Sequence, residues 1–140
     1  MRRDHITVLP LLIALSSAAS AACPEGHLSV SSEVHKSHAV FIGVVLGERL
    51  VPAKSENLDG TLYTVKIEEL LRGSVPPRVE VFSENSSGRF PMTKGRKYLL
   101  FVHREQNQLA VDNCGNSGPL SEKAGVLDAV RKLVRRPSEP

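Results

Sequence analysis

Residues 94–102, with the sequence Lys-Gly-Arg-Lys-Tyr-Leu-Leu-Phe-Val, decide how this chain is expected to fold. A turn glycine and basic residues lead into five consecutive apolar or aromatic residues. A short apolar run of this kind, bounded by a turn signal, is typical of a strand in the core of a β-sheet protein. Cys114, one of only two cysteines, follows the predicted strand and is a candidate covalent anchor.

Four further segments have the composition of strands. Residues 39–46 form a β-branched apolar run that is interrupted by Gly43, where the strand could bend or bulge. Residues 61–71 alternate between apolar and polar side chains, as in a half-buried strand. Shorter strands are expected at 79–82 and 109–114.

Polar segments with turn residues separate these strands. Residues 47–60 and 85–94 contain Pro, Gly and Asn signals and are expected to be exposed loops. A polar hairpin turn is expected at 105–108. Five strands connected in this way predict a mainly β protein, a small Greek-key barrel, with helices beside it.

The expected helices flank the strands in the sequence. Residues 31–38 lack Gly and Pro and predict a short helix. Residues 120–136 predict a longer one, because apolar side chains recur at three- and four-residue steps before Pro137. Basic residues in its last turn complement the helix dipole and are expected to stay solvated.

The first 21 residues have the order of a secretory signal peptide. Arg2 and Arg3 precede an apolar run over 6–15, and small residues follow it up to Ala21. The run is shorter than the about 20 apolar residues that a membrane span needs. We expect export and cleavage after Ala21 or Ala22, a mature domain over 22–136 and a disordered tail over 137–140. Lipidation of Cys23 is the less favoured alternative, because Ser20 replaces the usual larger aliphatic residue.

The two cysteines are expected to form a disulfide. In an exported chain Cys23 and Cys114 are more often paired than free. Their bond would close a loop of nearly the whole domain, worth about 4–5 kcal/mol in the chain-entropy model. The alternatives, a metal site or a catalytic thiol, lack a second thiol nearby in the sequence or an activating base.

Charge and motifs argue against several classes of function. The formal net charge is only +3, and there is no Trp, with two Tyr and four Phe. Nucleic-acid binding is therefore not expected, since it needs a basic face interleaved with aromatic residues. The chain has no nucleophile elbow, phosphate loop or zinc-protease motif, so we expect no enzymatic activity, no cofactor and no stable membrane insertion.

A histidine pair is the candidate for metal binding. His35 and His38 are three residues apart, which on a helix would place both imidazoles on one face. With His27 upstream and Glu33 nearby they could form a surface copper or zinc site, although nearby surface histidines without a metal are more common.

Several short stretches carry a resemblance to a known family. They are Ala39-Val40-Phe41-Ile42-Gly43-x-Val45, Tyr63-Thr64-Val65, Leu71-Arg72-Gly73, Gly95-x-x-Tyr98-Leu99-Leu100-Phe101 and Cys114. In this order they resemble the netrin-module and tissue-inhibitor-of-metalloproteinases superfamily across essentially the whole mature chain. The resemblance implies a five-stranded OB-type barrel with a C-terminal α-helix.

The chain departs from this family at its cysteines. Family members commonly begin Cys-x-Cys, and the first cysteine bridges to a mid-chain Cys-Gly. Here Ser87-Gly88 stands at the place of the Cys-Gly, and alignment of Cys23 with the second cysteine leaves Ala21 at the first. The resemblance therefore implies that one whole bridge is missing.

The same departure bears on function. In the inhibitors the amino group and carbonyl of the first cysteine chelate the zinc of the protease. Only cleavage after Ala22 would expose such a cysteine, Cys23, with Pro24 where the family inserts a side chain into the protease. We expect an extracytoplasmic module, secreted or periplasmic, that binds a protein or other macromolecule. A metalloprotease inhibitor and a histidine-based metal-binding protein are the alternatives.

Overall fold

The computed structural model describes residues 23–24, 26–54 and 59–135 of the 140-residue chain. The predicted signal peptide and the predicted disordered tail lie outside the described residues. In chain order the elements are α1 (Val30–Lys36), β1 (Ala39–Val51), β2 (Gly60–Gly73), β3 (Arg78–Glu84), β4 (Lys97–Glu105), β5 (Gln108–Ala110), β6 (Gly118–Pro119), the 3-10 turn η1 (Leu120–Glu122) and α2 (Ala124–Arg135).

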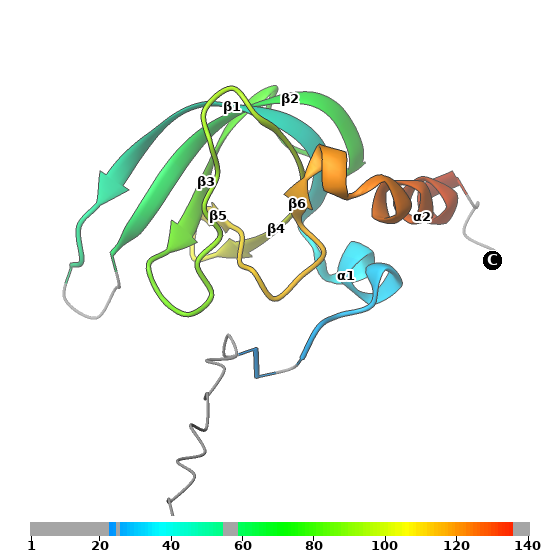
Figure 1. The fold of residues 1–140 in the computed structure, drawn as a ribbon, viewed down its shortest axis with the longest axis horizontal. Coiled ribbons are helices and arrows are strands. Elements are labelled where there is room, and N and C mark those ends of the chain that lie inside the picture. Colours follow the sequence, from blue (N-terminus) through cyan, green and yellow to red (C-terminus); the bar gives the residue numbers. More distant parts are fainter. Residues whose placement is uncertain (1–22, 25, 55–58, 136–140) are drawn as a thin grey trace, which may run out of the picture.

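The strands form one sheet that closes on itself as a ring (Figure 1). Their order is β1-β2-β3-β5-β4-β6, and β1 also pairs with β4. Of the recorded pairings only β3–β5 is parallel, through Val81 with Leu109 and Phe82 with Ala110. β1 pairs with β2 on one side and with β4 on the other, and the β1–β4 pairing closes the ring.

The predicted core strand is β4, and its alternate side chains serve two separate cores. Tyr98, Leu100 and Val102 point into the ring, whereas Leu99 and Phe101 pack outside it against the helices. Successive strand residues face opposite sides of a sheet, so a strand buried on both faces reads as an unbroken apolar run. This is why residues 98–102 form an unbroken run of apolar and aromatic side chains.

β1 bends around the ring where the sequence predicted a bend. Its pairing with β2 shifts register at three places, one of them between Ile42 and Gly43. A Cβ atom at Gly43 would lie 2.4 Å from Cγ1 of Val65. The glycine therefore lets β2 approach β1 closely at a bulge, which confirms the prediction at Gly43.

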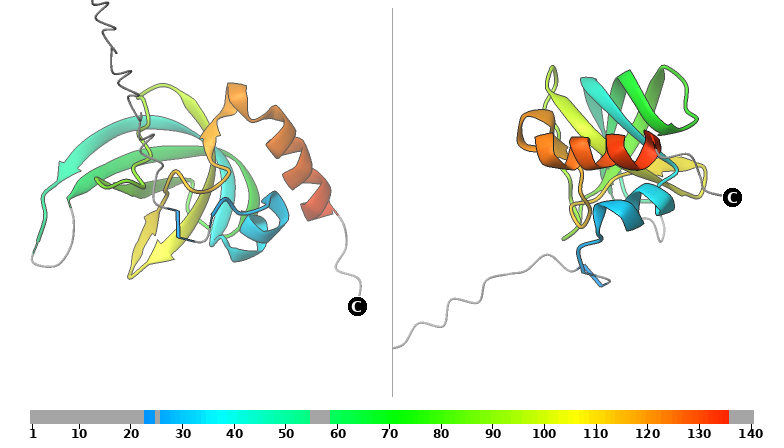
Figure 2. Two further views of the ribbon diagram at one scale, coloured as in Figure 1. Left: turned by 60° about the horizontal axis from the view of Figure 1, so that its bottom comes forward. Right: turned by 90° about the vertical axis from the view of Figure 1, so that its right-hand side faces the viewer.

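Both helices lie on the same outer side of the ring, next to each other (Figure 2). Val34 of α1 and Val130 of α2 are buried against Val40 and Leu99 of the sheet. Arg72 of β2 holds the end of α1, because its guanidinium Nη1 donates hydrogen bonds to the carbonyl oxygens of Val34 and Ser37. Such bonds satisfy carbonyls that have no partner within the helix.

Two sequence predictions about strand and loop bounds were wrong in part. β1 continues to Val51 and β2 begins at Gly60, so the expected loop 47–60 is partly strand. Residues 55–58 of this loop lie outside the described residues. The fifth strand ends at Ala110 and does not reach 114, because a turn follows in which Oδ1 of Asp112 accepts the Cys114 N–H at 2.8 Å. The hairpin turn predicted at 105–108 is confirmed.

The helices are also shorter than expected. α1 ends at Lys36, because Ser37 is extended with φ −67° and ψ 142°. The C-terminal helix begins at Ala124, and the expected first turn from Leu120 is a 3-10 turn closed by the Lys123 N–H on the Leu120 carbonyl at 3.1 Å.

Truncation of Leu99 tests the outer core. Leu99 is fully buried, so Leu99→Ala should lower the free energy of unfolding by about 2–5 kcal/mol, since a cavity remains where the side chain packed. Chemical denaturation of the mature domain measures the change. Leu50→Ala is the matched control: Leu50 is 83% exposed, and its truncation should stay within about 0.5 kcal/mol of the parent. Equal effects of the two substitutions would contradict the assignment of two cores.

Candidate functional site

A disulfide joins the two cysteines, as the sequence predicted. Cys23 and Cys114 have an S–S distance of 2.00 Å and a Cα–Cα distance of 5.6 Å, across a sequence separation of 91 residues. The bond ties the N-terminal strap, which we define as residues 23–24 and 26–29, to the turn that follows β5. The strap is thereby held beneath the ring (Figure 1).

A buried carboxylate holds the other side of this turn. Glu33 of α1 is only 8% exposed, and its Oε2 accepts hydrogen bonds from the backbone N–H of Asn116, at 2.7 Å, and from its Nδ2. The same Nδ2 donates to the Leu28 carbonyl at 3.0 Å. A Cβ atom at Gly115 would lie 2.0 Å from Oε1 of Glu33, so the close approach requires a glycine there. Helix, turn and strap are therefore joined at one point.

Burial raises the pKa of the Glu33 carboxyl above its ordinary value of 4.5. The nearby charge of Asp112 also raises this pKa, whereas the hydrogen bonds from Asn116 and the charge of Lys123 lower it. Loss of water around the carboxylate outweighs the two hydrogen bonds.

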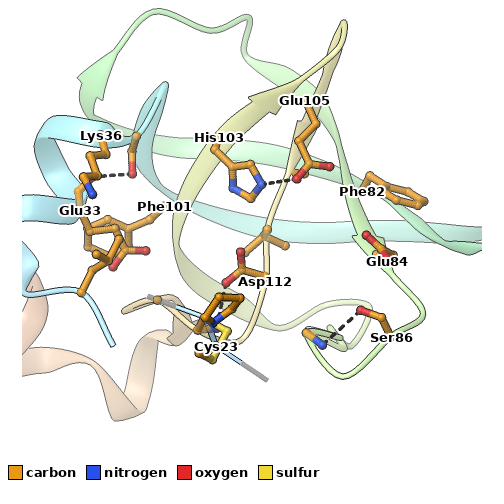
Figure 3. A pocket seen from close by; sticks show the side chains of 18 of the residues that line it. Cys23, Glu33, Lys36, Phe82, Glu84, Ser86, Phe101, His103, Glu105 and Asp112 are labelled. Atoms are coloured by element: carbon orange, nitrogen blue, oxygen red, sulfur yellow. Dashed lines mark hydrogen bonds and ion pairs between the residues drawn. A yellow bond between two sulfur atoms is a disulfide. The ribbon is translucent and has the colours of Figure 1, made fainter. Parts of the chain in front are cut away.

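An open groove of about 630 Å³ lies between the strap and the outer face of the sheet (Figure 3). In the strand register Phe82 of β3 and His103 of β4 both lie opposite Ala110 of β5. Their neighbours Val81 and Val102 face the ring interior, so Phe82 and His103 face outward. The side chain of Ala110 is smaller than those of Phe82 and His103 on either side of it, so it leaves a depression between them.

The strap and a loop form the walls of the groove. Cys23 and Pro24 line one part, and residues 86–88 line another. Asn113, the residue before Cys114, donates its backbone N–H to the Gly88 carbonyl and its Nδ2 to the Ser87 carbonyl, each at 3.0 Å. These two hydrogen bonds from Asn113 hold the loop against the turn that contains Cys114.

The candidate inhibitory residues lie at this groove. The Cys23 carbonyl accepts the Gly26 N–H at 2.9 Å, and Pro24 is exposed. The residues before Cys23 lie outside the part of the chain that the structure describes. The structure therefore places Cys23 and Pro24 at the edge of a concave surface, which residue spacing alone did not predict.

The two histidines proposed as metal ligands do not share a helix face. His35 lies in α1, where its Nδ1 is 2.7 Å from the Ser31 carbonyl. His38 lies beyond the helix end, with its Nε2 3.3 Å from Nη2 of Arg104. Within the described ranges no group of three or more His, Cys, Asp or Glu residues could hold a metal ion. Metal binding by this pair stays a prediction, without the helical spacing that suggested it.

Sequence reasoning missed the residues that hold the groove in shape. Asn113, Gly115 and Asn116 surround the predicted Cys114, but their sequence resembles an ordinary polar loop. Glu33 was considered only as a companion to the histidines. Its partners are more than 80 residues away, as the separation of 83 to Asn116 shows, so no local pattern could indicate them.

No protein family and no curated protein matches this chain. Among the described helices none is both long and apolar enough to traverse a lipid bilayer.

The raised pKa of Glu33 predicts a specific dependence of stability on pH. The pKa of this carboxyl is higher in the folded than in the unfolded chain, so at a pH between the two values the folded chain binds more protons. Its contribution to stability is therefore complete at a pH below the ordinary pKa of 4.5. The contribution is lost as the pH rises through the pKa of the folded state. We expect the unfolding free energy of the parent chain, relative to that of Glu33→Gln, to fall as the pH rises from 4.5 through the pKa of the folded state. Denaturant titrations at a series of pH values measure it, and a difference that grows with pH would contradict the assignment.

Proposed function

We propose that this chain is an exported, non-catalytic OB-fold module of the netrin and metalloproteinase-inhibitor type that binds a protein partner outside the cytoplasm. Three observations support the fold: β1 pairs with both β2 and β4, β3 contacts β5 in parallel, and a helix follows the last strand. A small five-stranded Greek-key barrel accounts for this connectivity.

Export is supported by two independent features. The first 21 residues have the charged, apolar and small-residue order of a signal peptide. The second feature is the disulfide between Cys23 and Cys114, because disulfides persist in oxidising compartments and are rare in the cytosol.

The observation that carries the binding function is the open groove beside the disulfide. Its volume of about 630 Å³ lies in the range of about 300–1,000 Å³ that is common for ligand sites. The walls are fixed by the disulfide and by the bonds from Asn113 and Asn116, so little ordering is needed when a partner binds. A groove open along the surface suits an extended segment of a protein better than an enclosed small molecule.

Site-specific photo-crosslinking tests this proposal. A photoreactive residue at Ser86, which is exposed in the groove wall, should form an adduct with a protein of one mass when the mature chain is produced in its native host. The control position is Lys66, which is exposed on β2 and does not line the groove. Adducts that are absent, or that are equal at the two positions, would argue against a groove-binding module.

Metalloprotease inhibition is the second candidate, because the disulfide holds Cys23 at the groove with Pro24 exposed beside it. Under the family mechanism only a chain that starts at Cys23 can chelate zinc. We expect a chain beginning at Cys23 to inhibit a zinc protease and a chain retaining Ala22 not to do so. Intact mass of the native protein identifies the start, and equal results for both chains would remove this candidate.

A further inference from the structure

The groove has more acidic than basic side chains. Its lining includes the carboxylates of Glu33, Glu84, Glu105 and Asp112, and its cationic or titratable basic groups are Lys36 and His103. Glu33 is buried and held by Asn116, so three carboxylates remain for a ligand. The chain as a whole has a net charge of +3, which makes this local excess of negative charge distinct from its average.

The three remaining carboxylates differ in how far the protein satisfies them. Oε1 of Glu105 lies 2.9 Å from Nε2 of His103, and Oδ1 of Asp112 accepts the Cys114 N–H. The carboxylate of the half-buried Glu84 makes no hydrogen bond or ion pair with any residue that the structure describes. A carboxylate that has lost part of its water without gaining a partner favours an incoming cation.

An aromatic ring lies beside the unpartnered carboxylate. Phe82 and Glu84 are two residues apart on β3, so both face the groove, and Phe82 is half-buried. Figure 3 shows Phe82 and Glu84 at one side of the pocket, Glu105 beside His103, and Asp112 nearer to Cys23. A cation over an aromatic face is attracted by the ring, and its aliphatic stem can pack on the apolar floor.

We propose that the groove recognises an extended segment of the protein partner through a lysine or arginine side chain, which lies on Phe82 between the carboxylates of Glu84, Glu105 and Asp112. This inference rests on the proposed binding function and adds the chemistry of the partner. The open shape admits a main chain along the groove, and the small Ala110 leaves room for the stem of the side chain. An anionic or purely apolar segment would leave Glu84 desolvated and unpaired.

Three matched peptides test the charge of the partner. The probes are acetyl-Gly-Ala-X-Ala-Gly-amide with X as lysine, norleucine or glutamate, titrated at low salt into the ¹⁵N-labelled mature domain and followed by NMR. The lysine peptide should shift the amide resonances of Phe82, Glu84, Ala110 and Asp112. Norleucine has a similar stem without the charge, and we expect it and glutamate to bind at least about tenfold more weakly. Added salt should weaken the lysine peptide only, because it screens the ion pairs.

Variants of the chain test which residues are responsible. The double substitution Glu84→Gln with Asp112→Asn removes two charges and should weaken the lysine peptide at least about fivefold. The amide introduced at position 112 keeps an oxygen that can accept the Cys114 N–H, so the turn retains its hydrogen bond. Glu48→Gln removes one exposed charge on β1 outside the groove and should leave the affinity unchanged. Amide spectra of each variant confirm that the fold is intact.

Several outcomes would overturn the inference. They are equal shifts from the three peptides, shifts located away from the groove, no shifts at millimolar lysine peptide, or equal weakening by Glu84→Gln with Asp112→Asn and by Glu48→Gln. If crosslinking at Ser86 captures a partner whose yield the double substitution does not change, the binding function stands and the cationic specificity fails. If neither a crosslinked partner nor a peptide shift is found, both proposals fail.

Discussion

The closure of the sheet through β1 and β4 is the constraint on which the other features depend. β1 pairs with β4 from Ala39 with Val102 to Val44 with Lys97, and the paired strands bury side chains on both faces. Inside the ring they form the larger core, and outside it they form the surface that α1 and α2 cover. A one-residue slip in this register would exchange the two sets of side chains, so both cores oppose it.

The groove begins where this cover ends. The helices pack on Leu99 and Phe101 of β4, whereas His103 and Glu105 on the same strand face line the groove. The disulfide then brings the N-terminal strap across the uncovered part, and Glu33 with Asn116 fixes the distance between helix and strap. One face of one strand therefore serves as core at one end and as a candidate binding surface at the other.

The loop at Ser87-Gly88 is supported without a disulfide of its own. Two hydrogen bonds from Asn113 tie it to the residue next to Cys114, so the single disulfide and its neighbour hold both walls of the groove. Unlike a disulfide, these hydrogen bonds do not restrict the unfolded chain, and the stabilisation they supply is smaller. The turn of residues 112–116 therefore holds both walls of the groove, through the disulfide and through the hydrogen bonds of Asn113 and Asn116.

The sequence by itself determined the mainly β class, the buried strand at 98–102, the bulge at Gly43 and the pairing of Cys23 with Cys114. These features follow from local periodicity, from glycine stereochemistry and from the presence of only two thiols. Only the tertiary structure decided the groove, the clamp of Glu33 on Asn116 and the row of Phe82, Ala110 and His103. Each of these features joins residues that are far apart in the sequence. They come together only when the ring closes, so no local pattern of side chains predicts them.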